Sequence, residues 1–347
     1  KYWKSCFCLK ILYYVTDHGL GHASRTVAII RELRKKKIQI VIRSNDPFKF
    51  LKQSLPEIKI ISGQTDFQPV MCKKNGMLFD ESKTKINISD WINQMPILIK
   101  KESVIIKKIQ PDIIISDVSF MPILTASKNN IKSILVSNFV WNESLKISSN
   151  LRTYIKNSYE NAHTILRLPL GTPVNFQNTH KMGIVARHPT CTRKQIRNFL
   201  GVKSSEKLVL VSLSGKKQIQ LKHSKNIKIL DISNYSVIKK NNLKNLTEGQ
   251  NLIIAADLVI CKCGYGFASE CLTSKTRFYY ILEPKHKESN SIHKELQKLG
   301  LKNRISINSL LKTVINDEFI ESAGMAKLPI DNQNIAKKII KITDKVI

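Results

Sequence analysis

The sequence predicts an α/β fold built from two doubly wound, Rossmann-like domains. A chain of 347 residues suggests two domains, and 42% hydrophobic residues can give each domain a core. Short apolar runs alternate with helical patterns in both halves, which favours parallel sheets covered by helices. In each half a glycine-bearing turn follows an apolar run and opens into a helix.

The charge balance favours anionic partners. Lysine and arginine number 57 against 26 acidic residues, a formal net charge of +31. The excess is dispersed among abundant isoleucine and asparagine, as a general compositional bias would produce. No arginine-rich block or nucleic-acid motif is present, so we expect no nucleic-acid partner. An anionic membrane surface stays open as a partner.

Seven scattered cysteines, without a recognisable signal peptide, favour a reducing compartment and free thiols. Cys6-x-Cys8 and Cys261-x-Cys263 lack the gap that is usual for zinc, so we expect no metal site. No apolar run reaches the span of a bilayer. We therefore expect a cytoplasmic protein, with a basic surface that could hold it at the inner face of the membrane.

The first half opens with a strand at residues 9–15, a turn at 16–25 (TDHGLGHASR) and a helix at 26–36. The dinucleotide-binding fingerprint is only half present, because Gly19-x-Gly21 is followed by Ser24 instead of a third glycine. No acidic residue ends the next strand. These departures argue against a dinucleotide cofactor.

The remaining elements follow from the same alternation of apolar runs and helical patterns. In the first half we expect strands at 38–42, 58–61, 113–116 (ending at Asp117) and 133–137 (ending at Asn138), and helices at 47–53, 88–108 and 121–128. A cluster of Pro and Gly at 168–177 predicts the interdomain connection. In the second half we expect strands at 207–212, 227–231, 258–261 and 277–282, and helices at 193–200, after the loop with Gly264 and Gly266, at 292–299 and at 334–345.

The stretch 256–270 (ADLVICKCGYGFASE) predicts an anion site. A buried strand ends in a loop with Gly264 and Gly266, and Ser269 and Glu270 fall in the first turn or so of the next helix. Backbone N–H groups and the helix dipole would favour a phosphate there. A polar loop at 283–290 follows the next strand, so both loops would face one crevice.

Two motifs carry a resemblance to a known family. CKCGYGFASECL followed by KESN resembles the nucleotide-sugar-binding half of MurG-like glycosyltransferases, and more closely the glycosyltransferase-like part of plant arabinokinases and their prokaryotic relatives. Gly21-His22 followed by Arg25 resembles the Gly-His-x-x-Arg signature of the same group. The resemblance covers most of the chain and is weakest at residues 62–95. It implies the GT-B architecture, two α/β domains that face a cleft.

In that architecture residues 1–170 would bind the acceptor, 178–330 would bind the nucleotide-sugar, and 331–347 would form a helix that packs back on the first domain. The resemblance implies a hexosyltransferase-like enzyme that moves a sugar from a nucleotide-activated donor, a UDP-sugar, to the hydroxyl of a lipid-linked, glycan or small-molecule acceptor. The sequence contains no Asp-x-Asp. We therefore expect metal-independent, inverting transfer with no cofactor beyond the nucleotide-sugar as co-substrate.

The proton of the acceptor hydroxyl requires a base, and a histidine suits that task. The motif selects His22, with Asp117 at the end of a neighbouring strand to orient the imidazole. A structural histidine is the alternative. His18 has the weaker claim because it does not match the motif. We expect Gly21, Arg25 and Asn138 to contact acceptor or phosphate.

On the donor side, Glu270 would accept hydrogen bonds from ribose hydroxyls, unless it only complements the helix dipole. The other expected donor-binding residues are Ser214, Gly215, Lys262, Gly264, Gly266, Ser269, Glu288, Ser289 and Asn290. Lys262-Cys263 and Tyr265-Gly266-Phe267 depart from the MurG pattern, which leaves the donor open. A nucleotide-sugar epimerase of the same fold and a non-catalytic sugar-nucleotide binding module are the alternative functions.

Overall fold

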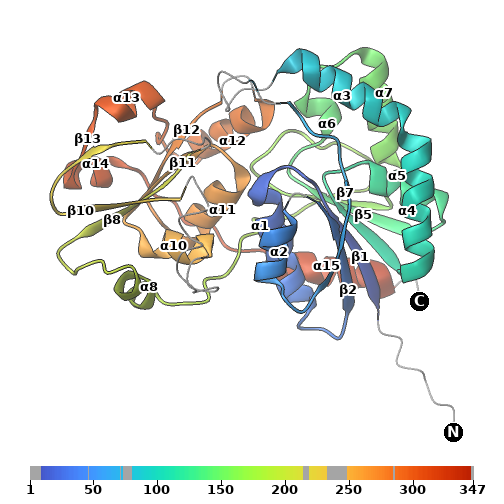
Figure 1. The fold of residues 1–347 in the computed structure, drawn as a ribbon, viewed down its shortest axis with the longest axis horizontal. Coiled ribbons are helices and arrows are strands. Elements are labelled where there is room, and N and C mark those ends of the chain that lie inside the picture. The colour runs from blue at the N-terminus through green and yellow to red at the C-terminus, as the bar shows by residue number, and fades with distance from the viewer. Residues whose placement is uncertain are drawn as a thin grey trace, which may run out of the picture. The chain divides into compact units, whose positions relative to one another are not determined.

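The computed structural model describes residues 9–45, 47–70, 72, 80–213, 219–232, 248–283 and 286–344. Its contacts divide the chain into two units. Unit 1 contains the described residues within Lys1–Val70, Glu81–Val185 and Asp331–Ile347, and unit 2 contains those within Met71–Asp80 and Ala186–Ile330. Each unit has a parallel sheet with helices (Figure 1). The predicted α/β class is confirmed.

Unit 1 is organised around a seven-stranded parallel sheet with the order β3-β2-β1-β4-β5-β6-β7. Its strands are β1 (Lys10–Val15), β2 (Gln39–Ser44), β3 (Lys59–Ser62), β4 (Ile113–Asp117), β5 (Lys132–Ser137), β6 (Thr164–Arg167) and β7 (Thr179–Lys181). The chain builds outward from β1 to β3 and then returns to place β4 on the other side of β1. This reversal creates a switch point, where ligands bind in α/β sheets of this kind.

The helices of unit 1 bury apolar faces against this sheet and against one another. They are α1 (Gly19–Leu33), α2 (Phe48–Ser54), α3 (Glu81–Asn93), α4 (Met95–Ile109), α5 (Met121–Lys128), α6 (Trp141–Ser144), α7 (Ser149–Glu160) and α15 (Asn332–Asp344). The last helix, α15, packs against α1. Strand β4 is buried along its whole length, as expected for a central strand covered on both faces.

Unit 2 contains a four-stranded parallel sheet with the order β10-β8-β11-β12. Its strands are β8 (Lys207–Ser212), β10 (Ile227–Asp231), β11 (Leu258–Lys262) and β12 (Phe278–Ile281), and a separate pair joins β9 (Lys222–His223) to β13 (Val314–Ile315). Its described helices are α8 (Arg193–Phe199), α10 (Gly249–Ala255), α11 (Tyr265–Ser274), α12 (Lys287–Lys298), α13 (Ile307–Lys312) and α14 (Asp317–Ser322).

Several predicted boundaries differ from the structure. The first helix begins at Gly19, not at residue 26, because the positive φ of Gly19 (+67°) turns the chain directly into the helix. The single helix predicted at 88–108 is two helices, since the proline in the first turn of α4 has no backbone N–H to continue the hydrogen bonds of α3. No helix among the described residues is long and apolar enough to cross a membrane.

The predicted interdomain connection at 168–177 lies inside unit 1. After it, β7 pairs with β6 and extends the first sheet, and the two units divide between Val185 and Ala186. The Pro and Gly cluster therefore forms a turn between two strands of one sheet. Strand β7 has only three residues, which is too short to produce a recognisable pattern.

Candidate active site

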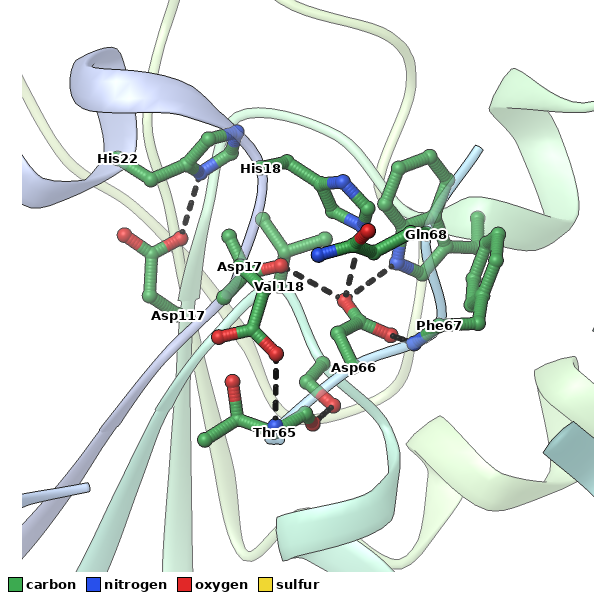
Figure 2. A network of polar contacts seen from close by, with 12 residues as sticks. Asp17, His18, His22, Thr65, Asp66, Phe67, Gln68, Asp117 and Val118 are labelled. Atoms are coloured by element: carbon green, nitrogen blue, oxygen red, sulfur yellow. Dashed lines mark hydrogen bonds and ion pairs between the residues drawn. The ribbon is translucent and has the colours of Figure 1, made fainter. Parts of the chain in front are cut away.

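The carboxyl ends of β1 and β4 lie side by side at the switch point of unit 1. Val15 at the end of β1 pairs with Asp117 at the end of β4. His22 lies in the first turn of α1, directly after β1, with Gly21 before it. The Nδ1 atom of His22 is 3.0 Å from Oδ1 of Asp117, as Figure 2 shows. The structure thus brings together two predicted residues that are 95 positions apart.

Arg25 completes this cluster one turn further along α1. Its Nε donates to Asp117 Oδ2 at 2.9 Å and its Nη2 donates to Oδ1. The same Nη2 lies 2.8 Å from Nδ1 of His22, and Nη1 donates to Oδ1 of Asn138 at 2.5 Å. Arg25 is 2% exposed and Asn138 is fully buried. Both residues were predicted to contact acceptor or phosphate. In the structure their side chains belong to a buried network of hydrogen bonds around Asp117.

The environment of Asp117 keeps it ionised. Burial alone would raise the pKa of this carboxyl, but the charges of Arg25 and His22 and their hydrogen bonds outweigh burial and hold the pKa below its usual range. The backbone beyond it is constrained as well. Ser119 N donates to Asp117 O at 2.8 Å across Val118, whose φ of +65° is rare for a β-branched residue.

A second carboxylate, Asp66, lies beside this cluster in the segment after β3 (Figure 2). Its Oδ2 accepts hydrogen bonds from Thr16 Oγ1 at 2.8 Å and from Trp141 Nε1 at 3.0 Å, and its Oδ1 accepts one from Phe67 N at 3.0 Å. Nε2 of His18 lies 3.8 Å from Oδ2. Asp66 is fully buried, and this burial raises its pKa to about 8.

Asp17 is a third buried carboxylate at this end of the sheet. It accepts hydrogen bonds from the backbone N–H groups of Asn45 at 3.1 Å and Thr65 at 2.9 Å, which ties the segments after β1, β2 and β3 together. Its charge contributes to the raised pKa of Asp66. Neither carboxylate was predicted from the sequence as a site residue. Asp66 lies in the stretch where the predicted pattern is loosest.

In unit 2, the predicted donor residues gather at the carboxyl ends of β11 and β12. Lys262 is the last residue of β11, Gly264 is the N-cap of α11, and Gly266 lies in the first turn of that helix. A Cβ atom built at Gly264 would meet nothing within 4 Å. The backbone of Gly264 is extended, so the glycine is not needed for conformation, and its absence of a side chain leaves the helix N-terminus open.

Ser269 and Glu270 lie in the second turn of α11, because that helix begins at Tyr265. Ser269 Oγ donates to the carbonyl of Gly266 at 3.0 Å. Both carboxylate oxygens of Glu270 accept from Arg187, at 2.7 and 3.2 Å, and both residues are about 5% exposed or less. The carboxylate of Glu270 is thus paired within unit 2, and its predicted contact with ribose hydroxyls stays a prediction.

Glu288, Ser289 and Asn290 belong to the first turn of α12, which begins at Lys287, and not to a loop. Ser289 is fully buried, and its backbone N–H donates to Nδ1 of His286, the N-cap of that helix, at 3.3 Å. The Nδ2 atom of Asn290 donates to the carbonyl of His286 at 2.9 Å. Ser214 and Gly215 lie outside the described residues. Within the described part of the chain, no three His, Cys, Asp or Glu side chains gather into a potential metal site.

The two parallel α/β units share the GT-B fold with solved glycosyltransferases. The profile of glycosyl transferase family 1 matches residues 9–196, which is more than half of the chain. The chain belongs to that family. The resemblance to MurG-like glycosyltransferases predicted from the two motifs is confirmed.

Among curated proteins, the chain is similar to L-arabinokinase of Arabidopsis thaliana, with 24% identity over 293 residues. This alignment covers 79% of the chain but only 28% of the arabinokinase, so the chain spans under a third of that relative.

Solved structures share the fold at low identity. The Streptomyces glycosyltransferase SsfS6, complexed with thymidine diphosphate, matches with a TM-score of 0.56 and 12% identity, over 96% of this chain and 99% of that one. MurG of Acinetobacter baumannii matches with a TM-score of 0.51 and 15% identity, over 96% of this chain and 99% of that one.

Proposed function

We propose that this protein transfers a sugar from a nucleotide-activated donor to an acceptor hydroxyl, with His22 as the proton acceptor. The observation that carries the proposal is the contact between Nδ1 of His22 and the buried carboxylate of Asp117 at the switch point of unit 1. An imidazole oriented by an ionised carboxylate is a suitable general base near neutral pH.

In this mechanism Nδ1 of His22 carries a proton and donates a hydrogen bond to Asp117, so the nearby Nη2 of Arg25 donates to Asp117 and not to Nδ1. Nε2 of His22 then takes the proton of the acceptor hydroxyl. The acceptor oxygen bonds to the anomeric carbon as the bond from that carbon to the donor phosphate breaks, and the nucleoside diphosphate leaves with the bonding electrons. Displacement from the opposite face inverts the anomeric configuration. Asp117 then stabilises the imidazolium, and Arg25 keeps the carboxylate in place through two hydrogen bonds.

Unit 2 supplies the expected site for the diphosphate. The N-terminus of α11 is open at Gly264, and Lys262 brings a positive charge to the same strand end. Backbone N–H groups, the helix dipole and this ammonium can together stabilise the charge that develops on the leaving phosphate without a divalent metal. SsfS6 has been solved with thymidine diphosphate, which supports a nucleoside diphosphate as the class of ligand. A UDP-sugar is the first donor to test.

The test is turnover, measured as release of nucleoside diphosphate from a panel of nucleotide-sugars, with water or added hydroxyl compounds as acceptors. His22→Ala should lower turnover on the order of a hundredfold, because it removes the general base, and should leave donor affinity nearly unchanged. Asp117→Asn should lower turnover less than deletion of the base. His163→Ala is the matched control, since His163 is an exposed histidine of the same unit.

Full turnover in His22→Ala would show that the histidine is structural, and so would a variant that is inactive only because it unfolds. Thermal unfolding of each variant separates loss of catalysis from loss of fold. Absence of binding and turnover with every nucleotide-sugar in the panel would refute the proposed activity itself.

A further inference from the structure

Glu283, two residues after the end of β12, is a buried carboxylate that forms an ion pair with Lys262. Its side chain is 2% exposed, and the Nζ atom of Lys262 lies 2.5 Å from its Oε1. Within the described part of the chain, Oε2 of Glu283 has no hydrogen-bond partner. A buried carboxylate normally collects several donors, whereas among the described residues one flexible side chain compensates the charge of Glu283.

Lys262 also lies where the donor phosphates are expected. It ends β11 two residues before Gly264, the open N-cap of α11, and its side chain is 32% exposed. Its ammonium can therefore reach solvent or a ligand while it is paired with Glu283. A lysine is a compact point charge on a flexible stem, and a diphosphate is a stronger partner for it than one carboxylate.

We propose that a nucleoside diphosphate bound at the N-terminus of α11 takes Lys262 away from Glu283, and that Glu283 then takes up a proton from solvent. This inference rests on the proposed function, because it requires the diphosphate to bind at this end of β11. The exchange balances, since the ion pair becomes a lysine–phosphate pair plus a neutral carboxylic acid. When the product diphosphate leaves, Glu283 loses its proton and recovers Lys262.

The surroundings of Glu283 explain why it would be protonated. Burial already raises the pKa of this carboxyl, and the charge of Lys262 is the main influence that lowers it. Of the other described groups, Glu288 on α12 raises the pKa of Glu283 further, and burial raises the pKa of the neighbouring Cys263 thiol to about 12, so that this thiol stays neutral. His286 is the N-cap of α12, and Ser289 Oγ accepts a hydrogen bond from Glu283 N.

Loss of Lys262 from the pair therefore raises the pKa of Glu283 in the complex above its value in the free protein. At a pH between these two pKa values, binding of the diphosphate is accompanied by proton uptake. Affinity for the diphosphate should therefore rise as pH falls through this window, at most tenfold per pH unit. Outside the window, where Glu283 has the same protonation in both states, affinity should not depend on this residue's titration.

The experiment is calorimetric titration of the full chain with UDP between pH 5 and 8.5, in pairs of buffers with different ionisation enthalpies. Wild type should show uptake of up to one proton per UDP, with affinity that falls as pH rises. Glu283→Gln should show no such uptake and should bind UDP several-fold more tightly than wild type at pH 8, because Lys262 no longer leaves a charge behind. The terminal phosphate of UDP titrates near pH 6. Subtracting the proton uptake of Glu283→Gln from that of wild type removes the contribution of this phosphate.

Two further variants sharpen the test. Lys262→Met should bind UDP more weakly and without proton uptake, which keeps the inference testable if Glu283→Gln fails to fold. Glu295→Gln is the matched control, because Glu295 is an exposed carboxylate on α12 paired with Lys298, and it should behave as wild type. Equal proton uptake in wild type and Glu283→Gln, or binding to wild type that is independent of pH, would overturn the inference alone. Failure of wild type to bind any nucleoside diphosphate would overturn the proposed function with it.

Discussion

Asp66 should make unit 1 less stable as pH rises from about 4 to 8. The folded protein raises the pKa of this carboxyl from 3.8 to about 8, so over that range the folded state holds a proton that the unfolded chain has lost. Stability therefore falls with increasing pH until the folded carboxyl also ionises near pH 8. A difference of about 4 pH units at about 1.36 kcal/mol per unit gives an upper figure of roughly 5 kcal/mol.

Asp66→Asn removes this titration. The oxygen of the amide can still accept from Trp141 Nε1 and Thr16 Oγ1. Its NH2 group cannot accept from Phe67 N, and this loss lowers the stability by about 1–3 kcal/mol at every pH. The variant should therefore be less stable than wild type near pH 4, where the wild-type carboxyl is largely protonated in both states. Near pH 8 it should be more stable by roughly 2–4 kcal/mol.

Urea unfolding followed by tryptophan fluorescence between pH 4 and 8.5 measures this difference, since Trp91 and Trp141 are both buried in unit 1. Asp90→Asn is the control, because Asp90 is an exposed aspartate on α3 and should leave the pH profile unchanged. Parallel pH profiles for wild type and Asp66→Asn would refute the reasoning. They would show that Asp66 is ionised in the folded protein, with a compensating charge such as protonated His18 at 3.8 Å.

Three other predictions concern separate parts of the molecule. Arg187→Ala should destabilise unit 2 by about 3–5 kcal/mol, because it leaves the Glu270 carboxylate buried without its two hydrogen bonds, and an unchanged Tm would contradict this. Arg25→Lys should lower turnover about tenfold or more with donor affinity unchanged, since an ammonium cannot hold Asp117 through two parallel bonds; equal turnover would mean that charge alone suffices. Turnover should persist after chelation, whereas loss with EDTA and recovery with magnesium would contradict metal-independent transfer.

The sequence predicted elements best where apolar runs are bounded by polar residues. Strands β8 and β10 have the predicted bounds, and His22 and Asp117 were found because each follows a recognisable strand. Helix starts were less predictable. Glycines at the start of α1 and α11 suggested long loops, but Gly19 only turns the chain and Gly264 adopts ordinary extended backbone, so both helices begin earlier than their composition indicated.

Polar pairs between residues far apart in the chain could not be predicted from the sequence. Asp66 finds its partners 50 and 75 residues away in Thr16 and Trp141, and Glu270 finds Arg187 83 residues away. Nothing in local spacing distinguishes such carboxylates from solvated ones, because their burial depends on how the whole sheet assembles. The same limit applies to Arg25, whose motif was recognised but whose burial against Asp117 and Asn138 was not.

The packing of α15 on α1 has a consequence for the order in which the chain folds during its synthesis. Unit 1 is discontinuous, since unit 2 is inserted before its last helix. Ile335 and Ile339 of α15 are fully buried, and Asp331 bonds to the backbone of Gly183 and Ile184 on the earlier part of unit 1. A ribosome therefore finishes the segments of unit 2 before it delivers the helix that supports α1, the element that carries His22. Unit 2 can complete its core during translation, and the histidine cluster reaches its final packing only afterwards.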